Sequence, residues 1–239
     1  MKGLYFLIDA CTLIVPLLFS FHPKIRFYSS WKSFFTGSML VAIFFIGWDI
    51  AFTHAAVWRF NPRYVTGVYL VNLPIEEVLF FICIPFSCVF TYYSLEKFFD
   101  LSWTPRAEKQ FCVLFSGALL ILGSIFTDKA YTAITLLSTA LVIVFLTFMV
   151  HVAWLGKAVS TYGILLVPFL LVNGILTGAG LQEPVVLYNN QENLGIRLWT
   201  IPIEDVLYGL ELFLLNVFAY ESIRKKYSTE PAILTTPHR

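Results

Sequence analysis

Long apolar runs separated by short polar segments dominate the sequence. Seven runs are long enough, or nearly so, to cross a bilayer. They lie near residues 3–21, 35–58, 78–96, 111–127, 131–150, 161–180 and 203–221. These spans must be helices, because unpaired backbone groups are too costly in hydrocarbon. The pattern therefore predicts an all-α integral membrane protein with about seven transmembrane helices.

The composition supports a membrane environment. Apolar residues make up 58% of the 239 residues and charged residues 13%, against roughly 45–50% and about 25% in soluble domains. One soluble core cannot bury so much apolar surface, so lipid is the expected solvent for much of the chain. These values exclude a disordered chain, a nucleic-acid-binding protein and an ordinary cytosolic enzyme. The net charge of +1 produces no global field that would attract a charged partner.

The basic residues predict the orientation in the membrane. The N-terminus and the segments after the second, fourth and sixth spans carry five of the 16 Lys and Arg residues. The other eleven lie on the opposite side. The positive-inside rule then places the N-terminus outside and the C-terminus in the cytoplasm, in a multi-pass protein of the cell (inner) membrane.

Two stretches of the sequence are related by an offset of 128 residues. Residues 67–80 (GVYLVNLPIEEVLF) and 195–208 (GIRLWTIPIEDVLY) share seven identities and four conservative differences without a gap. Spans 1–3 and 5–7 are therefore interpreted as two copies of one three-helix unit, joined by span 4. The predicted organisation comprises a first repeat (1–100), a linking helix (101–130), a second repeat (131–225) and a cytoplasmic tail (226–239).

The repeats are predicted to be parallel. Equivalent spans differ by four crossings, an even number, so they run in the same direction through the membrane. The two Pro-Ile-Glu-acid motifs, which begin the third and seventh spans, then lie at the same, outer face. We expect one composite cavity between the repeats at this face.

Each motif contains two consecutive acidic residues, Glu76-Glu77 in the first repeat and Glu204-Asp205 in the second. One interpretation is helix capping, because acidic residues near a helix N-terminus interact favourably with the dipole by about 0.3–1 kcal/mol each. Capping explains one acid per helix better than two in both repeats. The alternative is two carboxyl pairs at a common depth, where a protonated acid beside an ionised base transfers protons. On this interpretation the four acids are candidate catalytic residues, and the first glutamate of each pair is expected to matter most.

Other polar and aromatic residues extend this candidate site. Asp49 lies well inside the second span, where a carboxyl group costs about 2.5–3.5 kcal/mol on the insertion scale. Glu211 lies two helical turns beyond Glu204 on the same face. We expect both Asp49 and Glu211 to function or to form interhelical hydrogen bonds. Aromatic side chains near the acids could line a cavity that stabilises a transient cation. These supporting candidates are Trp48, Phe80, Phe81 and Tyr208.

Four classes of membrane protein are candidates for a chain with seven spans and buried acids. A retinal-type receptor needs a Lys near the middle of the last span, and residues 203–221 contain none. A prenyltransferase needs Asp-rich motifs for Mg²⁺-diphosphate, and Asp49 has no Asp or Asn one turn away. A transporter or carrier of a hydrophobic substrate fits parallel repeats, but few polar side chains line a path between the faces. An intramembrane acid–base enzyme acting on a hydrocarbon fits best, with the transporter and the prenyltransferase-like enzyme as alternatives.

Motifs for metals and cofactors are missing from the sequence. The His residues have no paired ligand spacing, and neither a dinucleotide fingerprint nor a phosphate-binding loop is present. The four Cys residues lie in apolar runs without a CxxC pair. We therefore expect no metal and no cofactor.

The duplicated Pro-x-Glu-Glu/Asp helix starts, on three-span units of this length, resemble the membrane-integral lycopene cyclases. These occur as two small heterodimer subunits in some bacteria, as fused single chains, and as the cyclase half of fungal bifunctional carotenoid enzymes. The resemblance covers residues 1–225. Asp205 stands where the first repeat has Glu77, so the two halves are not strictly equivalent.

The resemblance implies cyclisation of the linear ψ ends of lycopene to ionone rings, giving γ-carotene and then β-carotene. The reaction is a redox-neutral isomerisation through a carbocation, without the flavin of the other cyclase type. Lycopene or a related carotenoid is the implied substrate in the bilayer, and other enzymes of the carotenoid pathway are candidate partners. Both ring types, one or two rings, and C40 or C50 chains stay open, as does the assignment of acid and base.

Overall fold

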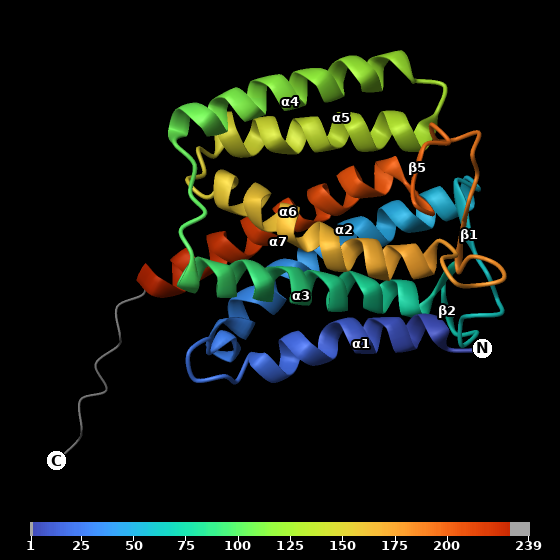
Figure 1. The fold of residues 1–239 in the computed structure, drawn as a ribbon, viewed down its shortest axis with the longest axis horizontal. Coiled ribbons are helices and arrows are strands. Elements are labelled where there is room, and N and C mark those ends of the chain that lie inside the picture. Colours follow the sequence, from blue (N-terminus) through green and yellow to red (C-terminus); the bar gives the residue numbers. More distant parts are fainter. Residues whose placement is uncertain (1, 230–239) are drawn as a thin grey trace.

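The structure, a computed structural model, describes residues 2–229, and seven helices form most of this part of the chain. They lie side by side with their axes roughly aligned (Figure 1). Odd-numbered helices run in one direction and even-numbered helices in the other (Figure 1). The predicted all-α fold is confirmed. The helices are α1 (Leu4–Phe19), α2 (Trp31–His54), α3 (Ile75–Phe98), α4 (Pro105–Ile125), α5 (Ala130–Val144), α6 (Leu155–Leu176) and α7 (Ile203–Thr229).

Two short helical turns complete the helical part. A 3₁₀ turn, Phe27–Ser30, precedes α2, and a π-helical turn, Phe145–Met149, continues α5. In the bundle α1 packs along α3, α2 along α7, and α5 between α4 and α7 (Figure 1).

Six of the helices, α2 to α7, are long and apolar enough to cross a membrane. The 16 residues of α1 are also apolar. At 1.5 Å per residue they span about 24 Å, less than the ~30 Å hydrocarbon core. Large apolar side chains such as Leu40, Leu114 and Val167 are exposed, as expected for helix faces in contact with lipid. The protein is therefore a multi-pass membrane protein.

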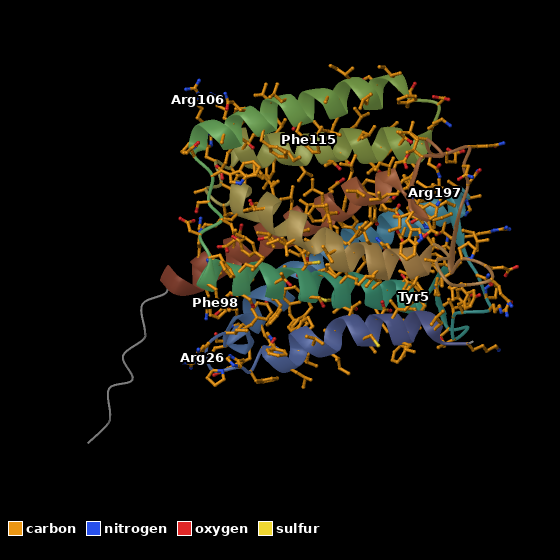
Figure 2. The ribbon with its side chains drawn as sticks, viewed as in Figure 1. Tyr5, Arg26, Phe98, Arg106, Phe115 and Arg197 are labelled. Atoms are coloured by element: carbon orange, nitrogen blue, oxygen red, sulfur yellow. The ribbon has the colours of Figure 1, made fainter. Side chains whose placement is uncertain are left out.

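Charged side chains gather at the two ends of the bundle. Arg26 and Arg106 lie at one end, and Arg197 lies at the other (Figure 2). The labelled arginines thus lie at the ends of the bundle (Figure 2), which is the arrangement expected when the middle of a bundle lies in a bilayer.

Helix ends differ from the predicted spans by up to eight residues, the largest difference being at the end of α7. Helices α2 and α6 each end four residues earlier than predicted. Ala56 and Gly178, just beyond these ends, have positive φ values of 56° and 112°, which a right-handed helix does not accommodate. Helix α3 begins at Ile75, three residues earlier than its predicted span, so its acidic pair occupies the first turn. The predicted tail 226–239 begins inside α7, and its residues 230–239 lie outside the described part of the chain.

Three short antiparallel strand pairs, which the sequence analysis did not predict, lie where α3 and α7 begin (Figure 1). Two of them are hairpins that lead directly into these helices, and the third joins the two repeats. Strands of two or three residues are too short for a period-2 pattern to reveal them. The pairs are β2 (Tyr69–Leu70) with β3 (Leu73–Pro74), β5 (Arg197–Leu198) with β6 (Ile201–Pro202), and β1 (Trp58–Phe60) with β4 (Val186–Tyr188).

Structural details recur at the 128-residue offset. In the pair of β1 with β4, Arg59 lies opposite Leu187, its own equivalent at this offset, so a pseudo-twofold axis passes through the pair. The hairpin residues Val71 and Trp199 are also equivalent, and both have a positive φ, of 59° and 61°. The two acidic motifs therefore emerge from like hairpins at the same end of the bundle.

Aromatic packing fills the bundle at the end opposite the strands. Phe27 is fully buried there, and its ring centroid lies 5.1–5.7 Å from those of Phe86, Phe90 and Tyr93. This packing closes that end of the bundle. Open space begins at the strands and the acidic motifs and continues along the helices as far as Thr91.

Candidate active site

A cavity lies between the two repeats on the side of the strands. It has a volume of about 320 Å³ and is lined by residues of both repeats, among them Glu77 and Asp205. Trp58 of β1 and Tyr188 of β4 form part of its wall, so the strand pair that joins the repeats also covers the cavity. The second acid of each motif thus faces one common space, as expected for parallel repeats.

Glu77 and Asp49 lie together in the wall formed by the first repeat. The Tyr5 hydroxyl donates a hydrogen bond to Glu77 Oε2 at 2.6 Å, and the Tyr208 hydroxyl donates to Asp49 Oδ1 at 3.1 Å. The two carboxyl groups are also within hydrogen-bonding reach of each other. Two carboxyl groups hydrogen-bond only with a proton between them, so this pair can carry a transferable proton.

Asp205 lies in the wall formed by the second repeat and accepts two hydrogen bonds. The Tyr131 hydroxyl donates to Oδ1 at 2.5 Å, and the Tyr188 hydroxyl donates to Oδ2 at 2.9 Å. Tyr188 belongs to β4, outside the helices. Burial raises the pKa of its hydroxyl well above the ordinary value, and the charge of Asp205 raises it further. Tyr188 therefore stays protonated and keeps donating to the carboxylate.

The first acid of each motif binds the loop before its hairpin instead of facing the cavity. Glu76 Oε1 accepts a hydrogen bond from the Thr66 backbone N–H at 2.6 Å. Glu204 Oε1 accepts from the Leu194 N–H at 2.8 Å and from the Thr132 hydroxyl at 2.6 Å. Thr66 and Leu194 are equivalent at the 128-residue offset. Neither Glu76 nor Glu204 is among the described residues that line the cavity. The sequence had led us to expect these two glutamates to matter most.

The predicted aromatic residues divide into two groups. Tyr208 and Phe80 line the cavity. Trp48 and Phe81 lie behind this lining: the Trp48 ring packs edge-on against Tyr208, with centroids 5.7 Å apart, and the Phe81 ring stacks on Phe45 at 5.9 Å. They support the wall without contributing to it.

Glu211 does not join the acids of the cavity. Its Oε2 accepts hydrogen bonds from the Ser138 hydroxyl at 2.7 Å and from the Thr139 hydroxyl at 3.2 Å. These bonds connect α7 to α5. Of the two roles that the sequence allowed for Glu211, the interhelical hydrogen bond is the one observed.

Sequence reasoning named Tyr208 but missed Tyr5, Tyr131 and Tyr188, whose hydroxyls donate to Glu77 and Asp205. A signal existed for Tyr5 and Tyr131, because each stands near the start of an equivalent span, the first and the fifth. Tyr188 and Trp58 carried no such signal, since their positions depend on the pairing of β1 with β4. An aromatic wall is formed by Trp58, Tyr131, Tyr188 and Tyr208. The centroids of its contacting rings lie 5.2–6.4 Å apart. Such rings present π faces that attract a cation.

The donor groups of the site are carboxyls and phenols. Within residues 2–229, no three His, Cys, Asp or Glu side chains are grouped so that they could hold a metal ion. Three carboxyl groups, of Asp49, Glu77 and Asp205, line this apolar cavity. Carboxyl groups around one space can chemically give a proton at one point and take one at another.

The fold and the site together define a class of protein, namely a multi-pass membrane protein with an apolar, carboxyl-bearing cavity between two parallel repeats. The sequence model of the family described as lycopene cyclase matches residues 2–95 and 128–223, and the chain belongs to this family. Its function is that of a carotenoid cyclase with a carotenoid substrate. Comparisons with curated proteins and with solved structures give no match.

Proposed function

We propose that the protein cyclises the ψ end groups of lycopene to ionone rings by a redox-neutral acid–base isomerisation, giving γ-carotene and then β-carotene. The observation that carries this proposal is one apolar cavity lined by the neighbouring carboxyls of Asp49 and Glu77 and by the tyrosine-bound Asp205. An acid and a separate base around an apolar space are what this isomerisation requires.

The Asp49–Glu77 pair is the proton donor in this proposal. Its shared proton goes to the terminal double bond of the end group, which becomes a carbocation while the pair becomes fully ionised. The neighbouring double bond attacks the cationic carbon and closes the six-membered ring, so that the positive charge moves onto the ring. The hydroxyls of Tyr5 and Tyr208 stabilise the negative charge left on the pair.

Asp205 is the proton acceptor. It removes a proton from the ring carbon beside the cationic centre, and the electrons of that C–H bond form the ring double bond. The substrate gains one proton and loses one, and no electrons are exchanged with a redox partner. Tyr131 and Tyr188 keep both carboxylate oxygens in position. A new cycle begins when the pair regains a proton and Asp205 loses one.

The aromatic wall protects and stabilises the carbocation. The rings of Trp58, Tyr131, Tyr188 and Tyr208 contact one another around the acids, and a cation near such a face gains about 0.5–2 kcal/mol per ring. The strands β1 and β4 cover the cavity on the side of the aqueous phase. Exclusion of water matters because water would add to the carbocation and divert the reaction.

Glu76 and Glu204 are positioning residues in this proposal. Each fixes the loop before its hairpin, and each is followed directly by the acid that faces the cavity. The first acid of each motif thus has a structural role in this proposal, as an acceptor for the preceding loop, and the acid–base interpretation describes the second acid. We further propose that the strand end of the bundle, with the N-terminus, lies outside the cell membrane, because eleven of the 16 basic residues belong to the opposite side.

Expression in cells that accumulate lycopene tests the proposed function. Pigment analysis should find ionone-ring carotenoids with the intact chain and unchanged lycopene with the Asp205→Asn variant at equal protein level. Purified protein in lipid should cyclise lycopene without added flavin, nicotinamide or metal. Unchanged lycopene with the intact, folded chain would overturn the proposal.

A further inference from the structure

The cavity extends far beyond the acids along the helices. On α3 its lining residues run from Glu77 to Thr91, which are fourteen positions or about 21 Å apart. On α1 they run from Tyr5 to Pro16, about 16 Å. Residues of α6 such as Leu165 complete the wall. The cavity is thus a groove along the bundle axis, with the carboxyl groups gathered at one end.

Away from the acids the groove is apolar, although several hydroxyl residues line it. The Thr12 hydroxyl donates to the Asp9 carbonyl at 2.8 Å, and the Thr91 hydroxyl donates to the Ser87 carbonyl at 2.8 Å. The Ser87 hydroxyl lies 2.9 Å from the carbonyls of Cys83 and Thr12. Hydroxyls bound to backbone carbonyls offer little to a ligand, so these side chains present carbon atoms to the groove.

Three prolines inside helices line this groove, namely Pro16 in α1, Pro85 in α3 and Pro168 in α6. A proline inside a helix removes the hydrogen bond to the carbonyl four residues earlier. The carbonyl that Pro16 leaves free, that of Thr12, accepts the Ser87 hydroxyl of α3 instead. Pro168 lines the groove and is also exposed on the protein surface, and Pro16 is partly exposed. The groove therefore opens towards lipid between α1 and α6.

We propose that this groove binds the polyene arm of the substrate while its end group reacts at the acids, and that the remainder of the arm leaves into lipid between Pro16 and Pro168. The proposal rests on the proposed function and specifies how the substrate lies. The occupant is inferred from the continuity of the groove with the acids, its length and its carbon-lined walls. A groove of about 21 Å is shorter than an extended C40 chain, so one substrate molecule presents one end at a time.

Filling the groove far from the acids tests the proposal. Cys88 lines the groove eleven positions beyond Glu77, about 16 Å along α3. Cys88→Trp should lower kcat/KM for lycopene by roughly 10- to 100-fold, because an apolar site rejects a chain that no longer fits. Cys11→Trp is the matched control, because Cys11 is an exposed cysteine of an apolar helix and should tolerate the same substitution without loss of activity.

A binding measurement separates this proposal from the proposed reaction. In the Asp205→Asn background, lycopene bound in lipid vesicles should change its visible absorption bands, because confinement alters the polyene. Adding Cys88→Trp should abolish the change, and adding Cys11→Trp should preserve it. Thermal unfolding of each variant establishes that the protein is folded.

The outcomes are distinct. Loss of lycopene binding on adding Cys88→Trp supports the groove, even if the intact protein proves not to cyclise lycopene. Cyclisation and binding by a folded Cys88→Trp variant at the level of the Cys11→Trp control would overturn the groove and leave the proposed reaction intact. If Cys88→Trp fails to fold, Pro168→Trp at the opening replaces it, with the same expected loss and the same contradicting result.

Discussion

Glu96 and Arg224 form an ion pair between equivalent positions of the two repeats. Arg224 Nη1 in α7 lies 3.2 Å from Glu96 Oε2 in α3, and the two residues are 128 positions apart. At the other end of the bundle, Arg59 lies opposite Leu187, which is also its equivalent at this offset. The pseudo-twofold axis thus passes through an ion pair at one end and a strand pair at the other. The cavity lies between these two connections.

Loss of the ion pair should affect stability more when Arg224 is replaced than when Glu96 is. Arg224 also lies 3.1 Å from Glu221, whose side chain is 5% exposed, so Arg224→Gln removes a partner from a buried carboxylate. We expect Arg224→Gln to lower the free energy of unfolding by about 1–3 kcal/mol. Glu96→Gln should cost less than about 1 kcal/mol, because its ion pairs are partly exposed. Thermal unfolding in detergent measures both, and equal losses would contradict this account.

The acids that face the cavity should matter most for activity. Glu77→Gln and Asp205→Asn should each lower kcat for lycopene by about 10²–10⁴-fold, because each removes a group that gives or takes the proton. Initial rates in lipid, normalised to folded protein, measure the effect.

The matched controls are the neighbouring residues Glu76 and Glu204. Glu76→Gln and Glu204→Gln should lower the free energy of unfolding by about 0.5–1.5 kcal/mol, since the hydrogen bond from the loop is weakened, while activity per folded molecule is largely kept. The opposite pattern, with activity lost in these two variants and kept in Glu77→Gln and Asp205→Asn, would make the first glutamates the reacting groups.

Tyr188 should contribute both to the rate of cyclisation and to the stability of the protein at alkaline pH. Tyr188→Phe leaves Asp205 with one hydroxyl donor. A hydrogen bond to a charged group contributes about 1.5–3 kcal/mol, so we expect its loss to lower the rate of cyclisation by roughly 10- to 100-fold. The folded-state pKa of Tyr188 lies above its unfolded value of about 10, because of burial and then the charge of Asp205. Its contribution to stability is therefore present below pH 10 and lost as the pH rises above it.

Unfolding measured from pH 8 to 12 checks the alkaline effect. The intact protein should lose stability above about pH 10 more steeply than Tyr188→Phe, since the variant has one phenol fewer to deprotonate. Identical slopes would mean that Tyr188 ionises as freely in the folded protein as in the unfolded chain.

Rings should form in separate binding events. The groove is shorter than the substrate and has one set of acids at its end. Formation of a second ring therefore requires the carotenoid to leave the groove and to bind again with its other end at the acids. A time course of pigments should therefore show a monocyclic carotenoid first, and any bicyclic product only after it. Excess substrate should increase the monocyclic share, because unreacted lycopene competes for the groove. A bicyclic product formed from the outset at a constant ratio would contradict this prediction.

Much of the architecture followed from the sequence. Hydrophobic runs of transmembrane length predict helices whatever the tertiary packing is, because hydrocarbon admits little else. The 128-residue offset predicts like units, and an even number of crossings between them predicts a common direction. The motif at residues 74–77 and its copy at 202–205 could therefore be placed at one end of the bundle, and the candidate acids could be named.

Which of those acids face the cavity was decided only by the tertiary structure. Glu76 and Glu77 are adjacent in sequence, yet consecutive helical residues point about 100° apart, so one binds the preceding loop and the other faces the cavity. Which direction meets a cavity depends on the neighbouring helices. The same holds for Tyr188, which reaches Asp205 because β4 pairs with β1, a contact between segments 128 residues apart that no local pattern encodes. Local periodicity determines the secondary structure of a segment, and long-range packing determines which residues its side chains contact.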